Sequence, residues 1–212
     1  MELTIIQKIV VYAVPTLLAI TVHEAAHGYA AKFFGDLTAE RMGRITLNPF
    51  KHIDPLGTVL LPALTILLGG VLFGWAKPVP VNYANLRQPK KDMLWVALAG
   101  PASNFFMAIF WVVVLGLADF LPQTSLDFMV HMGLAGLRVN LVLMVLNLLP
   151  MPPLDGGRIA VSVLPNAMAL QLSRVEQFGF LILVVLMFTG VLGMIITPII
   201  HVLEQLILAT FL

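Results

Sequence analysis

Long apolar stretches separated by short polar connections dominate the pattern of hydrophobic and polar positions along the chain. They cover residues 9–31, 93–121, 131–149 and part of 178–212, with a break suggested near Gly193 to Pro198. Each of the first three is long enough to cross a hydrocarbon layer of about 30 Å as a helix. The pattern therefore predicts an all-α polytopic membrane protein, folded as a helical bundle in a single integral-membrane domain over residues 1–212.

The connection at residues 35–57 has a different character, because it is rich in Gly, Pro and charged side chains. Within it, Ile45 and Leu47 alternate with the polar residues Arg44, Thr46 and Asn48. Alternation with a period of two is typical of a β-strand, and the flanking glycines and prolines would bound it. We therefore expect a short membrane-associated β-strand or hairpin after the first helix.

The apolar run at 56–76 is interrupted by Pro62 and several glycines, so it either crosses the bilayer or dips in and returns on the same side. If it returns, nearly all Lys and Arg outside the helices fall on one side, with Lys8 alone opposite. Cytoplasmic loops carry an excess of these residues. We therefore expect a re-entrant segment, an outside N-terminus, and the end of the first helix near the cytosol.

Composition supports the membrane assignment and narrows the chemistry. The chain is 59% hydrophobic, only 11% charged, and has a mean hydropathy of +0.97, whereas soluble domains are about 25% charged. A net charge of +1 without a basic run gives no indication of a nucleic-acid partner. The chain has 0 cysteines, so disulfides and thiolate metal sites are excluded. Any metal must be held by His and carboxylate side chains.

The most informative motif is His23-Glu24-Ala25-Ala26-His27, inside the first apolar stretch. In a helix, histidines four residues apart lie on one face about 6 Å apart along the axis, so both can bind one metal ion. The intervening glutamate can act as general base toward a water molecule made acidic by zinc. A structural polar cluster without metal is the alternative, but unpaired polar groups are costly at membrane depth. The H-E-x-x-H pattern therefore indicates a zinc hydrolase.

A catalytic zinc site uses about three protein ligands, so one more is needed. Asp155 is a candidate, since it follows Pro152-Pro153 and precedes Gly156-Gly157, which allow a tight turn. It could equally be a helix-capping or turn residue.

Other polar residues leave alternatives open. Arg138 and Asn140 either line a wet cavity or form a buried hydrogen-bond network. His52 is either a further metal or substrate group or a locally hydrogen-bonded loop residue. His201 and Glu204 are interpreted as an amphipathic helix end in preference to a second metal site.

Five runs of the chain are informative together: HEAAH, AGPASN (99–104), NLLPMPPLDGG (147–157), GRITLNPFKHIDPLGT and FGWAKPVPVN. Over about residues 20–160 they resemble the site-2 protease family of intramembrane zinc metalloproteases in a compact bacterial-type form, and they follow that family's order. The resemblance implies one zinc ion per chain held by His23, His27 and Asp155, Glu24 as catalytic base, and Asn147 as a substrate-positioning residue. Asn104 and His52 are further candidates for contacting the substrate or its oxyanion.

The resemblance also implies an activity and a location. The expected reaction is hydrolysis of peptide bonds within or near transmembrane segments of membrane proteins, in a multi-pass protein of a bacterial-type inner membrane, with the site near the cytosolic side. Its partners would be these substrates and the lipid bilayer, with no nucleic acid or nucleotide, and we expect no PDZ-like or nucleotide-sensing domain. A substrate helix must unwind before cleavage, and the expected strand near Ile45 would offer an edge to its exposed backbone.

Three other classes of protein could carry such residues. A zinc-binding scaffold or chaperone would not need Glu24. A zinc transporter would be expected to show several ligand sets along a path. A membrane-anchored peptidase for soluble substrates would need a longer extramembrane segment than this chain offers.

Overall fold

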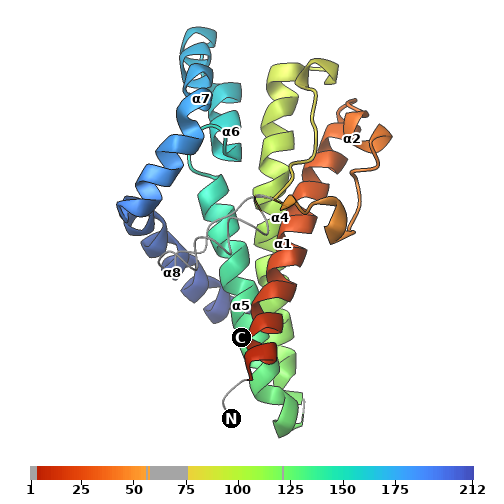
Figure 1. Cartoon of the computed structure of the whole chain (residues 1–212), viewed down its shortest axis with the longest axis vertical. Coiled ribbons are helices and arrows are strands. Elements are labelled where there is room, and N and C mark those ends of the chain that lie inside the picture. Colours follow the sequence, from red (N-terminus) through yellow and green to blue (C-terminus); the bar gives the residue numbers. More distant parts are fainter. Residues whose placement is uncertain (1–3, 56, 58–75, 121) are drawn as a thin grey trace.

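The computed structural model describes residues 4–55, 57, 76–120 and 122–212, which form helices and loops (Figure 1). The helices are α1 (Ile5–Phe33), α2 (Thr38–Arg41), α4 (Pro89–Leu117), α5 (Gln123–Asn147), α6 (Asp155–Val163), α7 (Asn166–Phe188) and α8 (Val191–Phe211). Within the described part of the chain, the 3-10 turns are η1 (Pro49–Lys51), η3 (Tyr83–Asn85) and η4 (Ala118–Phe120). Among the described residues, 5 helices are long and apolar enough to cross a membrane: α1, α4, α5, α7 and α8. The predicted polytopic, helical membrane fold is confirmed.

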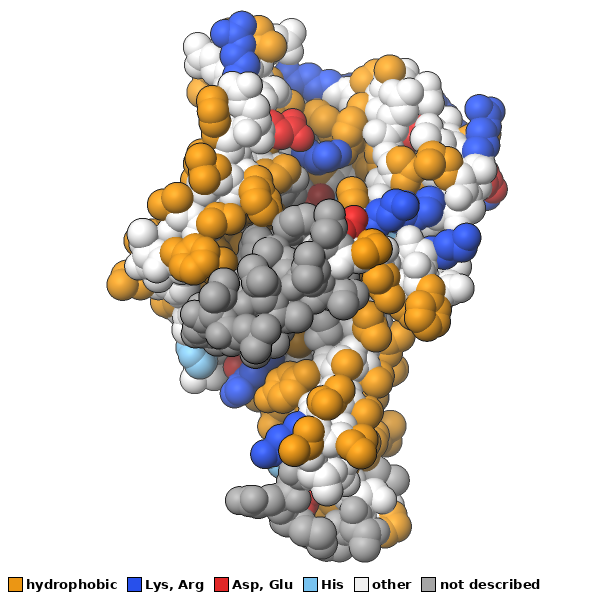
Figure 2. Space-filling view, viewed as in Figure 1, with side chains coloured by type: hydrophobic (Ala, Val, Ile, Leu, Met, Phe, Trp, Pro, Cys, Tyr) orange, Lys and Arg blue, Asp and Glu red, His pale blue; other side chains and the backbone are white. Residues whose placement is uncertain are grey.

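Helices α1, α4 and α5 run side by side and form the centre of the molecule (Figure 1). Helix α4 packs against both of the others and also against α6 and α8. The main apolar cluster joins α4, α5 and α8 through Ala108, Val112, Leu137, Leu141, Met144, Val145, Ile200 and Ile207. Large side chains on the outside, such as Phe106 and Phe188, are exposed. Figure 2 shows apolar side chains spread over this face of the helices, as a surface in contact with lipid requires.

Helix α1 begins with a capping box. The Thr4 hydroxyl oxygen accepts from Gln7 N, and the Gln7 side chain accepts from Thr4 N, which satisfies backbone donors left free at a helix start. The helix continues through Pro15 and ends at Phe33, followed by Gly35 at a φ of 110°. A single continuous helix therefore carries the HEAAH motif.

The predicted strand or hairpin near Ile45 is wrong, because residues 45–47 form bends and no strand occurs in the described part of the chain. Side chains take the backbone bonds that a ladder would use: Thr46 Oγ1 accepts from Asn48 N, and Asn48 Oδ1 accepts from Phe50 N. Ile45 instead packs on α1, where its Cγ1 would lie 3.0 Å from a Cβ added to Gly28. Ile45 therefore serves helix packing, whereas Leu47 is exposed.

Two helix boundaries also differ from expectation. Helix α5 begins at Gln123, so most of the expected polar connection after residue 122 is helical. The break in the C-terminal part lies at Gly190, whose φ of 76° is the left-handed conformation that ends helices, while Pro198 lies inside α8. The suggested break near Gly193 to Pro198 was therefore misplaced by a few residues.

The expected re-entrant run at 56–76 lies outside the described residues, apart from Gly57 and Ala76. Its described flanks meet, because Lys77 N donates to His52 O at 2.9 Å and Arg87 N donates to Phe34 O at 3.1 Å. Residues 34–52 and 77–87 therefore lie side by side, and the re-entrant arrangement of the run between them stays a prediction.

Candidate metal centre

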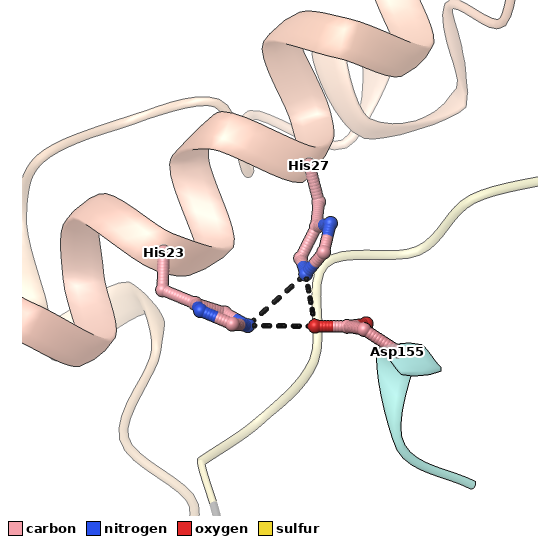
Figure 3. Close-up of side chains that lie close together, drawn as sticks. All are labelled: His23, His27 and Asp155. Atoms are coloured by element: carbon pink, nitrogen blue, oxygen red, sulfur yellow. Dashed lines mark hydrogen bonds and ion pairs between the residues drawn. The ribbon is translucent and has the colours of Figure 1, made fainter. Parts of the chain in front are cut away.

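The imidazoles of His23 and His27 extend from α1 toward the first residue of α6, Asp155 (Figure 3). The two Nε2 atoms lie 3.1 Å apart. Each lies 3.2 Å from Asp155 Oδ2. Both histidines are buried and Asp155 nearly so. The structure thus brings together three of the residues singled out in the sequence, from positions more than a hundred residues apart.

Hydrogen bonds on the far side of each ring determine which nitrogen faces the others. His27 Nδ1 lies 2.7 Å from Val96 O, and His23 Nδ1 lies 2.6 Å from Asn104 Oδ1. Carbonyl oxygens only accept, so both Nδ1 atoms carry the proton. Both Nε2 atoms therefore present lone pairs to the space between the rings.

Asp155 adds a third acceptor to this space. Its Oδ2 is buried without a hydrogen-bond partner among the described residues. Because both imidazoles carry their proton on Nδ1, neither Nε2 donates to Asp155, although each lies 3.2 Å from its Oδ2. Three acceptors facing one another without a donor would repel unless a cation lies between them.

The dimensions and chemistry of this group fit zinc. Nitrogen and oxygen ligands at about 2.0–2.1 Å in tetrahedral arrangement lie about 3.3 Å apart, close to the separations of 3.1 and 3.2 Å found here. Two imidazoles and one carboxylate are ligands that zinc accepts, and three protein ligands leave a position for water. His23, His27 and Asp155 could therefore hold one catalytic zinc ion.

Gly100 on α4 provides the room in which the imidazoles meet. A Cβ at this position would lie 2.4 Å from His27 Nε2 and 2.6 Å from His23 Nε2. No side chain larger than hydrogen fits without displacing the rings. Helix α4 thus forms one wall of the centre, and the lack of a side chain at Gly100 leaves space for the two imidazoles.

The start of α6 is fixed by close packing and by one polar contact. A Cβ at Gly156 or Gly157 would lie 2.2–2.3 Å from the backbone of residues 149 and 152, so the preceding turn folds directly onto the helix. One turn after Asp155, Arg158 donates through Nη1 to the Tyr83 hydroxyl and lies over its ring, 5.2 Å from the centroid. Burial raises the pKa of Tyr83 although Arg158 opposes this. Arg158 therefore anchors the carboxylate-bearing helix to η3.

Glu24 lies beside the centre on α1 and is half-buried. Its Oε2 accepts from Val79 N at 2.6 Å, in the connection that leads into η3. The two flanking residues, Pro78 and Pro80, have no N–H. The carboxylate is thus held by one backbone donor of a segment that packs on α1.

The remaining sequence candidates lie in different surroundings. Asn104 is fully buried and contacts His23 as described. Asn147 ends α5, and its amide donates to Leu143 O of the same helix. His52 is buried, and its Nε2 donates to Thr46 O at 2.9 Å, a local bond of the kind considered in the sequence. A contact of any of these three with substrate stays a prediction.

Arg138, Asn140 and Glu204, which lie on membrane-spanning helices, are paired. Arg138 Nε lies 3.0 Å from Glu204 Oε1, which joins α5 to α8, and Asn140 bonds to Asn104 and to Gly136 O. For Asn140 the buried hydrogen-bond network is observed, whereas Arg138 is paired but keeps 63% of its side chain exposed. Sequence reasoning did not identify two parts of the centre. One is the carbonyl of Val96, which no side-chain pattern indicates. The other is Gly100, which could have been noticed because it lies in the AGPASN run.

Comparison with known proteins adds independent information. The family "Peptidase family M50" matches residues 121–190, a part that contains Asp155. YwhC of Bacillus subtilis, named as a zinc metalloprotease, is 40% identical over 210 residues, which cover 94% of this chain and 90% of that protein. Rip2 of Mycolicibacterium smegmatis, also so named, is 37% identical over 180 residues, covering 84% of this chain and 66% of that protein. No solved structure gave a significant match.

Proposed function

Because the chain belongs to peptidase family M50, the zinc metalloproteases of the site-2 protease type, we propose that it hydrolyses peptide bonds within or near transmembrane segments of other membrane proteins. One observation carries the proposal: Nε2 of His23, Nε2 of His27 and Oδ2 of Asp155 lie within 4.8 Å of one another inside a bundle of membrane-spanning helices.

We assign these three residues as the ligands of one zinc ion per chain. Zinc bound there would act as a Lewis acid that polarises the scissile carbonyl and makes water acidic enough to ionise near neutral pH. The chain supplies the carboxyl group of Asp155 and the two oriented imidazoles, and Gly100 keeps other side chains out of the space between them.

Glu24 is proposed as the general base. It follows His23 directly on α1, so its carboxylate lies on the face of the helix next to the imidazoles. Its Oε2 accepts from Val79 N–H, which would orient the carboxylate so that Oε1 takes a proton from the attacking water. The same oxygen would then pass the proton to the leaving amine.

The depth of the centre supports a membrane-embedded substrate. His23 and His27 lie about 9 to 15 Å from the end of α1 at Phe33, at 1.5 Å per residue. A transmembrane helix hides its carbonyls in its own hydrogen bonds, so a substrate must unwind locally before its backbone reaches this depth. Asn147, near the turn that leads to Asp155, is proposed to contact the unwound chain.

The orientation in the membrane is also a proposal. The Lys and Arg residues at 32–51 and 77–91 flank the end of α1 that lies nearest to the centre. By the positive-inside rule this end faces the cytosol of a bacterial-type inner membrane.

A glutamate-to-glutamine comparison tests the proposal. Wild type and Glu24→Gln are each co-expressed with a panel of single-span membrane proteins, and membrane proteomes are compared for fragments that are lost in the variant. Purified Glu24→Gln is expected to keep zinc and to lose activity by at least about 100-fold, the usual contribution of a general base.

The matched control is Glu40→Gln, which changes an exposed carboxylate paired with Lys32 at 2.5 Å on the surface. It should cleave like the wild type. Retained cleavage in purified Glu24→Gln would rule out the base assignment, and zinc-loaded wild type without any fragment across the panel would favour a zinc-binding scaffold.

A further inference from the structure

The orientation of His23 depends on a side-chain amide. Its Nδ1 lies 2.6 Å from Asn104 Oδ1, and Asn104 is fully buried on α4. An asparagine can present either its oxygen or its nitrogen. Only the oxygen accepts the Nδ1 proton and leaves Nε2 with the lone pair that a metal ion needs. The direction of the Asn104 amide therefore decides whether His23 can serve as a ligand.

Two acceptors fix that direction. Asn104 Nδ2 donates to Ala19 O of α1 at 3.3 Å and to Asn140 Oδ1 of α5 at 3.0 Å. Ala19 O is a backbone carbonyl and can only accept. If the Asn104 amide were reversed, its oxygen would face these two acceptors and its nitrogen would face His23. The observed direction is thus the one that the surroundings allow.

Asn140 is oriented in turn by the backbone. Its Nδ2 donates to Gly136 O, one turn earlier on α5, at 2.8 Å. Its oxygen must therefore face Asn104. Both asparagines are fully buried, so no bulk water competes for these bonds. A chain of hydrogen bonds with one direction runs from a backbone carbonyl of α5, through α4, to the imidazole on α1.

The second histidine, His27, is oriented by a single hydrogen bond to the backbone. His27 Nδ1 donates directly to Val96 O, at 2.7 Å. Both ligand rings are thus oriented by backbone carbonyls, one directly and one through two side chains. The indirect connection can be altered by substitution.

We propose that Asn104 and Asn140 are positioning residues that hold His23 in its Nδ1–H form and so set the zinc affinity of the centre. This inference rests on the zinc ligands proposed above. A purely structural role, in which the same bonds only join α1, α4 and α5, is the competing explanation.

The test measures zinc affinity of the purified full chain by competition with a chelator, in Asn104→Leu and Asn104→Asp. Removal of an outer partner of a metal-bound histidine typically costs 10- to 100-fold in affinity. Asn104→Leu should therefore bind zinc about 10- to 100-fold more weakly. Asn104→Asp should stay within about threefold of the wild type, because one carboxyl oxygen still accepts the Nδ1 proton while the other, protonated, donates one bond to Ala19 O or Asn140 Oδ1.

The aspartate variant separates the two explanations. Its protonated carboxyl group replaces the two donor bonds of Asn104, to Ala19 and to Asn140, by one at most, so a purely structural role predicts a clear loss of zinc affinity and stability in this variant too. The tautomer is read separately by nitrogen NMR of the imidazoles, and thermal unfolding of the metal-free protein reports any loss of fold. Ser173→Ala, which removes a hydroxyl bonded to Ala169 O within α7, is the control expected to keep zinc affinity unchanged.

Asn140→Leu tests the next step of the chain. It should weaken zinc binding less than Asn104→Leu, by about 3- to 10-fold, because Ala19 O still orients Asn104. In the double variant with Asn104→Leu, it should weaken zinc binding no further, because the effects of substitutions within one hydrogen-bond network are not additive.

Two results would overturn the proposal: Asn104→Leu binding zinc as tightly as the wild type, or Asn104→Asp as weak as Asn104→Leu. His23→Ala is measured alongside. If His23→Ala binds zinc normally, the ligand assignment itself fails. If only the asparagine variants behave normally, the ligands stand and the positioning role fails.

Discussion

Two polar clusters lie inside this helix bundle, and they differ in charge balance. At one, Arg138 of α5 and Glu204 of α8 meet at 3.0 Å, so a cation and an anion satisfy each other. At the other, two imidazole nitrogens and a carboxylate oxygen face one another as acceptors. The Arg138 side chain is 63% exposed and only Glu204 is buried, whereas all three acceptors are largely buried, where unpaired polar groups are costly. The proposed cation site therefore differs from the ion pair in lacking a hydrogen-bond donor, and not in being polar or in lying within the bundle.

The largest effect is expected from removing the anionic member of the acceptor cluster. Asp155→Ala should reduce bound zinc by more than about tenfold and abolish proteolysis, since loss of a ligand costs more than loss of an outer partner. Metal analysis of purified protein measures this. The matched change in the other cluster, Glu204→Gln, should leave zinc bound. Full zinc occupancy in Asp155→Ala would remove this residue from the ligand set.

Filling the space between the imidazoles should come next. Gly100→Ala places a Cβ 2.4 Å from His27 Nε2, so the rings must move and zinc affinity should fall by about tenfold or more. Gly193→Ala is the control, because nothing lies within 4 Å of a Cβ there. It should leave zinc binding unchanged and stabilise α8 by up to about 1 kcal/mol. Chelator competition and thermal unfolding report the two quantities, and normal affinity in Gly100→Ala would contradict the packing described.

Breaking the balanced cluster should affect stability instead of metal binding. Arg138→Met leaves Glu204, which is 7% exposed, without its cation. We expect a loss of about 1–3 kcal/mol in the free energy of unfolding. The double change Arg138→Met with Glu204→Leu should recover much of this loss, because no unpaired charge remains. Unfolding in detergent measures both, and a drop in zinc content would show that the two clusters are coupled.

The smallest effect concerns a third carboxylate, Asp36, which is surrounded by donors. Burial raises its pKa, but bonds from Thr38, Asn85 and Asn82 outweigh this and lower the pKa from 3.8. These bonds stabilise the fold above the unfolded pKa, and the contribution is lost as the pH falls toward the lower, folded pKa. Unfolding midpoints between about pH 6 and pH 3 should therefore fall less in Asp36→Asn than in the wild type. Equal slopes would mean that this carboxylate adds no pH-dependent stability.

Much of the fold could be predicted because membrane helices are specified locally. The apolar stretch at 9–31 predicted α1 within a few residues, since hydropathy and length depend on consecutive positions. The loop near Ile45 failed for the opposite reason. Its alternating pattern suits a strand, but Arg44 bonds to the carbonyls of Lys77 and Pro78, which lie far away in the chain. Contacts with such distant residues determine the loop conformation, and they cannot be predicted from the alternation of apolar and polar residues within the loop.

Some contacts of the candidate site could also be predicted from local sequence, and others could not. His23 and His27 could be paired from their spacing alone, because a helix places positions four apart on one face. The residues around Asp155 are equally compatible with a metal ligand and with a helix-capping or turn residue, and only the family resemblance favours the ligand. The contact of Glu24 with Val79 and that of His27 with the Val96 carbonyl could not be found in the sequence, since backbone groups are the same at every position.

The sequence by itself determined that this chain lies in a membrane and that one helix offers two imidazoles and a carboxylate within five consecutive positions. Only the tertiary structure decided that Asp155 meets these imidazoles, that Gly100 gives them room, and that Asn104 and Asn140 orient one of them. The reason is physical: the period of a helix is set by near neighbours, whereas the position and direction of a hydrogen bond between distant segments are set by how the helices pack.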